Sequence, residues 1–359
     1  MSILNETILY VDLKKLEKNF IFLKTKLHPK TKIIGVVKAF AYGHGDLSIS
    51  KKLEELGIDA LWVSDFEEGI TLRKSGIKTK IIVANPGIKS YREIIKYNLD
   101  VILYSQRLLD LYCLNKKNIN VHIKFNTGMN RYGFNQNEMN LIVSKIKKNP
   151  HLNLLSICSH LSTSNNKEQK KHTQKQIRTF NLISKKFNLL LGKKIERHLL
   201  NSQGLLNFPE YQMDGVRLGI GLYGLGSKKL TPISSLYSVI TQIRDLKKGD
   251  SFGYGNSYTA NKKITVAIIP LGYADGLNRN LSNSIGSVFV NNIECVIIGE
   301  ISMDSFAIDI TSANAKEGDL VEIFGDQLTV SEIAKKINTI PYEIHSTLNR
   351  RIKRIYSDS

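Results

Sequence analysis

Short apolar runs alternate with longer segments of helical period between residues 30 and 220. Alternation of this kind is typical of strand–helix units around a parallel sheet, in which each buried strand is followed by a covering helix. We expect eight strands in this part of the chain, over residues 33–38, 60–63, 80–84, 101–104, 121–125, 154–159, 198–201 and 214–218. Eight successive units predict an α/β fold in which the sheet closes into a (β/α)8 barrel of the TIM type.

The pattern changes after about residue 230. Stretches rich in threonine, valine and isoleucine follow, and Gly-Asp pairs at 249–250, 318–319 and 325–326 mark turns, so a C-terminal, mainly β domain is expected. The length of 359 residues fits one barrel of about 250 residues plus an appended domain. We therefore predict a barrel domain over residues 1–230 and a β domain over residues 231–359, with an early strand at about 7–11 that is able to join the β domain.

Composition excludes several classes of protein. No apolar run approaches the roughly 20 residues of a membrane span, and the first residues lack the basic and apolar regions of a signal peptide. A cytoplasmic protein without a membrane partner is therefore expected. Cys113, Cys158 and Cys295 are odd in number, far apart and outside any Cys-x-x-Cys pair, which argues against a disulfide framework or a zinc site. No bound metal is expected.

The formal net charge of +19 raises the question of a nucleic-acid partner, because basic surfaces bind phosphate backbones. The lysines are scattered in short clusters such as 145–148 and 170–171, without a long basic tail or a nucleic-acid-binding motif. We therefore expect no nucleic-acid partner, and salt-sensitive retention on DNA would be needed to favour one. The positive field benefits an anionic cofactor in either case.

Polar residues directly after the apolar runs are the candidate chemical groups, because barrel enzymes gather their chemistry at the carboxyl ends of the strands. Residues in such positions are Lys38, Lys124, His160, Ser202 and Arg217. Lys38 follows the run 33–37 and precedes a turn with two glycines. A lysine in a partly dehydrated site has a lowered pKa and supplies a neutral amine that condenses with an aldehyde. An isolated lysine at a strand end is more often an ordinary solvated side chain.

Motifs in a fixed order along nearly the whole chain favour the chemical interpretation. The segment 36–45 reads Val-Val-Lys-Ala-Phe-Ala-Tyr-Gly-His-Gly, and further motifs follow at 67–73, 121–134, 159–163, 201–202, 216–220, 253–255, 272–276, 302–304 and 341–343. In this order they resemble the bacterial alanine racemases, which are enzymes of fold-type III that depend on pyridoxal 5'-phosphate (PLP). The resemblance implies an isomerase that interconverts L-alanine and D-alanine and supplies D-alanine for peptidoglycan.

The resemblance assigns the residues that bind the cofactor. Lys38 would carry PLP covalently, Arg217 would hydrogen-bond its pyridine nitrogen, and His160 would lie beside the ring. The residues expected around the phosphate are Tyr42, Ser202, Gly219, Ile220 and Tyr342. An arginine cannot accept the proton of a pyridinium, so Arg217 would keep the ring nitrogen unprotonated and limit decarboxylation and transamination. Outside these motifs, a serine such as Ser202 would be typical of a helix cap.

The same resemblance implies two bases and a shared active site. Lys38 of one subunit and Tyr254 of the other would face opposite sides of the substrate Cα, so the active form would be a head-to-tail homodimer. Arg131 would contact the substrate carboxylate and the phenolic oxygen of PLP, and Met303 would contact that carboxylate through its backbone. Lys124 would support Arg131, and its equivalent is carbamylated in many family members.

Four positions depart from the family pattern. Phe40 replaces a common asparagine, Asn126 and Asn165 stand where aspartate is usual, and Glu300 stands where arginine is usual. Asn165 and Glu300 belong to the substrate entrance in the family, so a racemase with a broader range of amino acids is one alternative. A PLP-dependent decarboxylase has the same two-domain architecture, but Arg217 argues against it. A non-catalytic PLP-binding barrel protein is disfavoured, because such proteins lack a domain after residue 230.

Overall fold

The computed structural model describes residues 6–358. The expected absence of a signal peptide concerns a segment that begins with residues 1–5, which lie outside the described residues. The chain divides into two compact units, which we call the barrel unit and the β unit. The barrel unit comprises Lys15–Ala41 and Asp46–Pro232, and the β unit comprises the residues up to Lys14, Tyr42–Gly45 and the residues from Ile233 onward.

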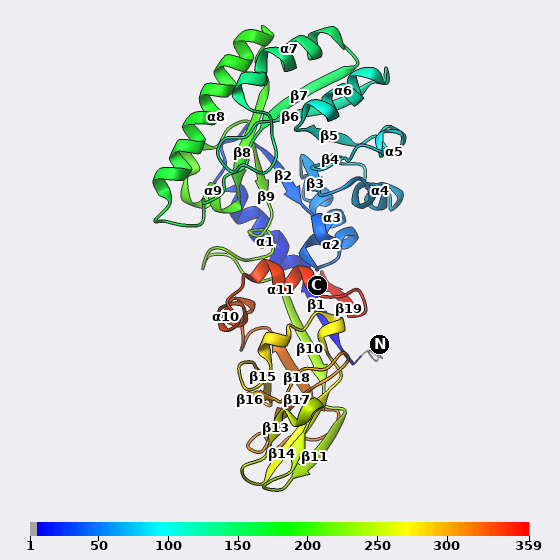
Figure 1. Ribbon diagram of the computed structural model, residues 1–359, viewed down its shortest axis with the longest axis vertical. Coiled ribbons are helices and arrows are strands. Elements are labelled where there is room, and N and C mark those ends of the chain that lie inside the picture. The colour runs from blue at the N-terminus through cyan, green and yellow to red at the C-terminus, as the bar shows by residue number, and fades with distance from the viewer. Residues whose placement is uncertain (1–5, 359) are drawn as a thin grey trace. The chain divides into compact units, whose positions relative to one another are not determined.

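Eight parallel strands close into the barrel of the barrel unit (Figure 1). In barrel order they are β2 (Lys32–Val36), β3 (Ala60–Val63), β4 (Lys80–Val83), β5 (Asp100–Leu103), β6 (Ile119–Lys124), β7 (Leu152–Cys158), β8 (Glu196–Asn201) and β9 (Gly215–Leu218). β9 pairs with β2 in parallel, with Ile34 opposite Arg217, and this pairing closes the sheet. Strands such as β3, β5 and β9 are buried on both faces, as expected where helices cover the outside of a barrel. The predicted (β/α)8 barrel is confirmed.

Helices accompany the barrel strands and begin or end at residues suited to their caps. They are α1 (Leu13–Lys24), α2 (Lys38–Tyr42), α3 (Asp46–Glu55), α4 (Phe66–Lys74), α5 (Tyr91–Lys96), α6 (Gln106–Leu114), α7 (Met139–Lys148), α8 (Lys170–Leu191) and α9 (Ser202–Asn207), with short 3-10 turns η1 (Gln136–Glu138) and η2 (Pro209–Tyr211). Asp65 caps α4 and Ser105 caps α6 through side-chain oxygens that accept backbone N–H bonds. α8 ends at Gly192 in the left-handed conformation.

A nine-stranded sheet forms the core of the β unit. Its order is β11 (Gln242–Leu246), β14 (Ile264–Ile269), β17 (Phe306–Asp309), β16 (Ile293–Ile298), β15 (Ser287–Val290), β18 (Leu320–Phe324), β10 (Ser234–Val239), β1 (Ile8–Asp12) and β19 (Lys353–Ser357). A separate hairpin pairs β12 (Ser251–Phe252) with β13 (Tyr258–Thr259). Three 3-10 turns complete the connections: η3 (Tyr254–Asn256), η4 (Tyr273–Asp275) and η5 (Arg279–Leu281). The predicted C-terminal, mainly β domain is confirmed, and β1 joins its sheet between β10 and β19.

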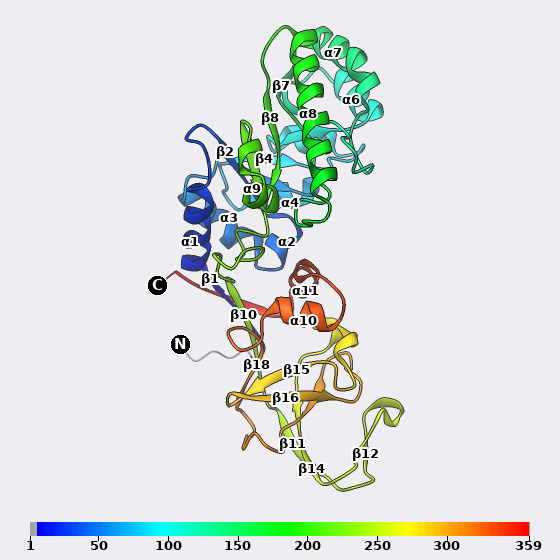
Figure 2. The ribbon, with the colours of Figure 1, turned by 90° about the vertical axis from the view of Figure 1, so that its left-hand side faces the viewer.

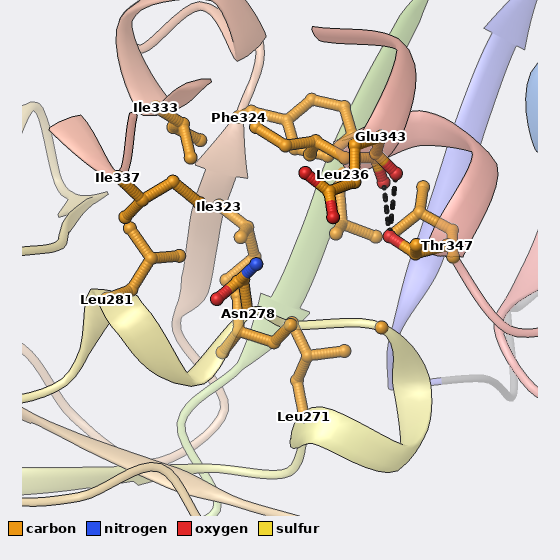
Figure 3. Close-up of a pocket in the computed structure, with 14 residues that line it drawn as sticks. Leu236, Leu271, Asn278, Leu281, Ile323, Phe324, Ile333, Ile337, Glu343 and Thr347 are labelled. Atoms are coloured by element: carbon orange, nitrogen blue, oxygen red, sulfur yellow. Dashed lines mark hydrogen bonds between the residues drawn. The ribbon is translucent and has the colours of Figure 1, made fainter. Parts of the chain in front are cut away.

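Two short helices, α10 (Val330–Lys336) and α11 (Pro341–Thr347), lie side by side in the β unit (Figure 2). Figure 3 shows the apolar pocket between these helices and the sheet, with Ile333 of α10 facing Ile323 and Phe324 of β18. α11 begins with Pro341, whose fixed φ suits the first helical position. This packing holds α11, the helix that carries Tyr342.

Two observations limit the kinds of site that the described residues form. No helix within residues 6–358 is both long and apolar enough to cross a membrane. The same part of the chain contains no group of three or more His, Cys, Asp or Glu side chains placed to hold a metal ion. Cys113, Cys158 and Cys295 are free thiols.

Candidate active site

Lys38 opens a left-handed turn shortly after β2. The residues 39–42 all have positive φ, between +51° and +56°. We predicted a strand through residue 38, but β2 ends at Val36, and the left-handed backbone from Ala39 onward rules out any further extension of the strand. This conformation costs a non-glycine residue roughly 1–2 kcal/mol, so the turn persists only where neighbouring groups hold it.

Glu68, on α4, is one of the groups that hold this turn. Its Oε1 accepts a hydrogen bond from Ala39 N at 2.6 Å, and its Oε2 accepts one from Ser64 N at 2.6 Å. Glu68 is itself fixed at the start of α4, where its backbone N–H donates to Asp65 Oδ1 at 3.0 Å. The carboxylate therefore ties the turn that begins at Lys38 to the end of the neighbouring strand β3. The sequence motif at 67–73 included Glu68, but nothing in it indicated this role.

The pKa of Lys38 is lowered, first by burial and then by the positive charge of Arg131, and is partly restored by Glu68. Burial and a neighbouring cation both disfavour the ammonium form. A larger fraction of Lys38 is therefore a neutral amine than of a solvated lysine at the same pH. This is the protonation state that an amine needs in order to attack an aldehyde or accept a proton.

Arg217, on β9, is buried and held by a dense set of acceptors. Its Nη1 donates to His198 Nδ1 at 2.6 Å and His198 O at 3.0 Å. Its Nη2 donates to Ser159 O at 2.6 Å, Leu199 O at 3.0 Å and His160 Nδ1 at 3.2 Å. The Nε–H of Arg217 donates to no residue of the described chain. One donor of a buried, oriented guanidinium thus remains free for a ligand.

His160 follows β7 and is held neutral. Burial and then the charge of Arg217 lower the pKa of His160 well below its usual range. A guanidinium has only donors, so the Arg217 bond makes Nδ1 of His160 an acceptor and places the ring proton on Nε2. The structure thus brings His160 and Arg217 into direct contact.

Ser202 and the segment after β9 form a small polar cradle. Ser202 Oγ accepts hydrogen bonds from Gly219 N at 3.0 Å and Gly221 N at 3.2 Å. A Cβ at Gly221 would lie 3.2 Å from Ser202 Oγ, so a larger residue there would crowd this hydroxyl. The Ser202 hydroxyl hydrogen and the Ile220 N–H have no acceptor among the described residues. Both are donors suited to an anion.

Lys124 is the last residue of β6, and Arg131 lies in the loop that follows it. Burial lowers the pKa of Lys124; the nearby Cys158 opposes this shift, and the charges of Arg217, Arg131 and Lys38 reinforce it. Arg131 is exposed and makes no hydrogen bond within residues 6–358. Asn126 organises the loop between them, because its Oδ1 accepts from the backbone N–H groups of residues 128 and 130 at 3.0 Å each.

Tyr42 and Tyr342 pack together in the β unit, with ring centroids 5.9 Å apart. Burial raises the pKa of both phenols, and Tyr342 raises the pKa of Tyr42 further, so each remains a hydrogen-bond donor. The glycines after Tyr42 are required by close approaches. A Cβ would lie 1.9 Å from His345 O at Gly43 and 1.8 Å from Tyr356 Oη at Gly45.

Tyr254 is exposed at 78% on the surface of the β unit, in a turn flanked by glycines with positive φ. It lines a hollow together with Glu300 and Ser302. Met303, which directly follows Ser302 in the chain, is exposed at 54%. Glu300 pairs with Arg279 at 2.6 Å, so its charge is matched within the same unit. Asn165, the other departure at the expected entrance, is exposed in the loop between β7 and α8.

The predicted site residues fall into two groups. The barrel unit contains Lys38, Lys124, Arg131, His160, Ser202, Arg217, Gly219 and Ile220, and the β unit contains Tyr42, Tyr254, Met303 and Tyr342. In the barrel unit, Arg217 contacts His160 directly, and the charges of Arg217, Lys124, Arg131 and Lys38 all lower the pKa of His160. Sequence reasoning missed His198, a direct partner of Arg217, and its only signal was a histidine at the first position of the predicted strand 198–201.

The fold and this group of residues define a barrel enzyme with a partly buried lysine and a buried arginine at the carboxyl ends of its strands. Two family descriptions match the chain: "Alanine racemase, N-terminal domain" over residues 11–227 and "Alanine racemase, C-terminal domain" over residues 233–356. The chain therefore belongs to the alanine racemase family, whose members are isomerases.

Individual relatives agree with this assignment over almost their whole length. The chain is 37% identical over 363 residues to an alanine racemase of Fusobacterium nucleatum, covering 97% of this chain and 99% of the relative. It is 35% identical over 358 residues to one of Thermodesulfovibrio yellowstonii, covering 96% of each. Among solved structures, alanine racemase of Clostridium difficile 630 aligns with a TM-score of 0.92 at 31% identity, covering 99% of this chain and 97% of that one.

A second solved structure bears on the cofactor. Alanine racemase from Bartonella henselae, described with covalently bound pyridoxal phosphate, aligns with a TM-score of 0.90 at 28% identity. The alignment covers 98% of this chain and 100% of that one.

Proposed function

We propose that this chain interconverts L-alanine and D-alanine with PLP as its cofactor, and that Lys38 and Tyr254 are the two bases. The observation that carries the proposal is the presence in the barrel unit of both Lys38, a partly buried lysine with a lowered pKa, and Arg217, a buried arginine that keeps one donor free. Membership of the alanine racemase family supports the same reaction.

The residues of the barrel unit fit PLP. Lys38 would hold the cofactor covalently through its neutral amine, and the free Nε–H of Arg217 would donate to the ring nitrogen. The unpaired donors of Ser202 and Ile220 would bind the phosphate, with Tyr42 and Tyr342 as further phenolic donors. When bound, the cofactor supplies an electron-withdrawing ring that stabilises negative charge on the substrate Cα.

Arg217 limits how strongly that charge is withdrawn. A guanidinium has no lone pair that accepts a proton and remains charged at every physiological pH, so it donates to the ring nitrogen without protonating it. The weaker withdrawal favours prompt return of a proton over loss of carbon dioxide or transfer of the amino group. This argues for a racemase over a decarboxylase with the same architecture.

Proton transfer needs one base on each side of the substrate Cα. Lys38 Nζ would become a free amine once the amino group of alanine takes its place on the cofactor; it would then take or give the proton on one side, and Tyr254 Oη of a second subunit would do so on the other. A proton leaves Cα to one base, and the opposite base delivers a different proton, so the configuration inverts. The high exposure of Tyr254 on its own chain, 78%, supports a partner that covers it.

The remaining charged residues would hold the substrate. Arg131, exposed and without a hydrogen-bond partner in the described chain, is free to bind the substrate carboxylate, assisted by the backbone of Met303. The lowered pKa of Lys124 favours the neutral amine that carbamylation requires, and the carbamate would pair with Arg131. We further propose that the enzyme is a cytoplasmic homodimer that supplies D-alanine for peptidoglycan.

Polarimetry of the purified holoenzyme tests the proposed substrate. L-Alanine, L-serine, L-lysine and L-arginine are supplied in turn, and the rate of loss of optical rotation is measured. We expect alanine to lose rotation fastest, and Lys38→Ala to abolish the loss. A protein that carries PLP and racemises serine, lysine or arginine better than alanine would instead be a broader amino-acid racemase.

A further inference from the structure

A line of buried polar side chains crosses the interior of the barrel. Asp100, His122, Ser156, His198 and Arg217 come from the successive strands β5, β6, β7, β8 and β9, and each is at most 5% exposed. Otherwise the strands contribute mainly apolar side chains to the core. A polar line in such a core is costly unless its members are hydrogen-bonded.

The direction of each hydrogen bond follows from Arg217. Arginine has only donors, so His198 Nδ1 accepts, at 2.6 Å, and the His198 proton lies on Nε2. That Nε2–H donates to Ser156 Oγ at 3.0 Å, which leaves the Ser156 hydroxyl to donate to His122 Nδ1 at 2.7 Å. His122 is then an acceptor at Nδ1 and carries its proton on Nε2.

The line ends at a carboxylate. His122 Nε2 lies 3.7 Å from Asp100 Oδ2, and both atoms are enclosed with no hydrogen-bond partner among the described residues. The other oxygen, Asp100 Oδ1, accepts from Asn120 Nδ2 at 2.8 Å. Each of the two enclosed atoms therefore has the other as its available partner, and the donors all run from the guanidinium towards the carboxylate.

The common direction of these hydrogen bonds matters because the groups at both ends of the line, Arg217 and Asp100, are buried. Arg217 has no carboxylate within ion-pair distance in the described chain, and Asp100 is the buried carboxylate on the described barrel strands. Aligned hydrogen bonds polarise one another in a low-dielectric interior, so the chain links a buried cation to a buried anion without direct contact. Removing an internal link would leave donors or acceptors unpaired on both sides of the gap.

We propose that Asp100, His122 and Ser156 are positioning residues for the racemase reaction: through the tautomer of His198 they hold Arg217 oriented, with its Nε–H free for the cofactor ring. The proposal rests on the function proposed above. None of the three is a hydrogen-bond partner of Arg217 in the described chain, so their effect is transmitted through His198. Because Arg217 acts on the cofactor ring and not on the substrate carboxylate, a weakened line should lower kcat and leave KM unchanged.

The first measurement concerns the protein alone, without cofactor or substrate. Nitrogen-15 NMR of histidine-labelled protein reports whether each ring is protonated at Nδ1, at Nε2 or at both. Single His→Gln substitutions at positions 122 and 198 assign the two signals. We expect both rings to be neutral and protonated at Nε2. A parent protein in which His198 is protonated at Nδ1, or is cationic at neutral pH, overturns the proposal without any variant having to fold.

The second measurement compares two deletions of a buried hydroxyl in the holoenzyme. Ser156→Ala removes the central link, and Ser184→Ala removes the hydroxyl of a buried serine on α8 that donates to Phe180 O. We expect Ser156→Ala to lower kcat roughly tenfold at unchanged KM and to shift the His198 signal, while Ser184→Ala changes neither. An active parent whose Ser156→Ala variant keeps kcat and the His198 tautomer overturns the positioning role, whereas an inactive parent with bound PLP overturns the proposed function itself.

Discussion

At the scale of residues, hydrogen bonds, burial and neighbouring charges set the protonation states of the histidines and of the lysine in the site. Arg217 fixes His160 and His198 as acceptors, and burial keeps both rings neutral. Lys38 responds to two opposite charges, because Arg131 lowers its pKa and Glu68 raises it. Because the two charges shift the pKa of Lys38 in opposite directions, removing each charge in turn should move that pKa in opposite directions.

Arg131→Gln should raise the pKa of Lys38 in the apoprotein, because a cation that disfavours the ammonium is removed. Glu68→Gln should lower it, because a carboxylate that favours the ammonium is lost. The pH dependence of Lys38 acylation, followed by mass spectrometry of its peptide, measures both shifts, with exposed Lys30 as the internal reference. Arg131→Lys keeps the charge and should leave the midpoint in place. Shifts of the same sign in the two glutamine variants would contradict this account.

The left-handed turn predicts that one substitution stabilises the protein. Ala39 is exposed with φ +53°, so Ala39→Gly removes a conformational penalty of roughly 1–2 kcal/mol and adds a smaller unfolded-state entropy cost. We expect the free energy of unfolding in urea to rise by about 0.5–1 kcal/mol. Lys51→Gly, at an exposed position of the right-handed helix α3, should lower it by about as much. A loss of stability in both variants would show that the turn is not strained at Ala39.

At the scale of elements, the segment after Lys38 connects the barrel strand β2 to the β unit. Gly43 and Gly45 lie where backbone or ring atoms of α11 and β19 leave no room for a side chain. Arg354 Nε also donates to Gly43 O at 3.1 Å, and Tyr356 Oη donates to His44 O at 3.0 Å. The Gly-His-Gly motif is therefore explained by packing within the β unit.

Two glycine-to-alanine substitutions separate backbone strain from close approach. Gly43 and Gly57 have similar φ, +82° and +77°, but a Cβ would meet His345 O at 1.9 Å in the first and nothing within 4 Å in the second. Gly57→Ala should cost about 1 kcal/mol of unfolding free energy, whereas Gly43→Ala should cost more than about 3 kcal/mol. Urea unfolding measures both. Equal losses would mean that strain alone, and not the contact with α11, requires glycine at position 43.

Most helices and strands could be predicted from the sequence, but the contacts between their side chains could not. Strands such as β3 were predicted to the residue, because a buried parallel strand is a short continuous apolar run. The sign of φ after Lys38 leaves no trace in the hydrophobic pattern, so the left-handed turn was missed. Asp100, His122 and His198 were also missed, because nothing in the sequence of each strand relates its polar residue to those of the other strands, and only barrel closure aligns them.

At the scale of the whole molecule, the proposed site needs both units and two copies of the chain. Lys38 belongs to the barrel unit, whereas Tyr254 is exposed on the β unit. If each active site takes its lysine from one chain and its tyrosine from the other, a dimer with one mutant of each kind contains one intact site and one without either base.

Mixing Lys38→Ala with Tyr254→Phe should therefore restore activity that neither variant has alone. Random reassembly of equal amounts gives about half mixed dimers with one good site of two, so recovery should approach roughly a quarter of the parental rate. Reassembly after mild denaturation, followed by a chiral assay of alanine, measures it. Each variant reassembled by itself is the control. No recovery despite demonstrated subunit exchange would contradict the shared site and leave the PLP assignment intact.

The most direct test of the central claim follows the α-proton of alanine. The holoenzyme and its Lys38→Ala variant are incubated with L-alanine in deuterium oxide, and the products are separated by chiral chromatography with mass detection. The account predicts that the parent yields equal amounts of the two enantiomers, that the D-alanine formed carries deuterium at Cα, and that Lys38→Ala yields none. A PLP-loaded parent that leaves L-alanine unconverted, or converts it to a keto acid or an amine, would contradict it.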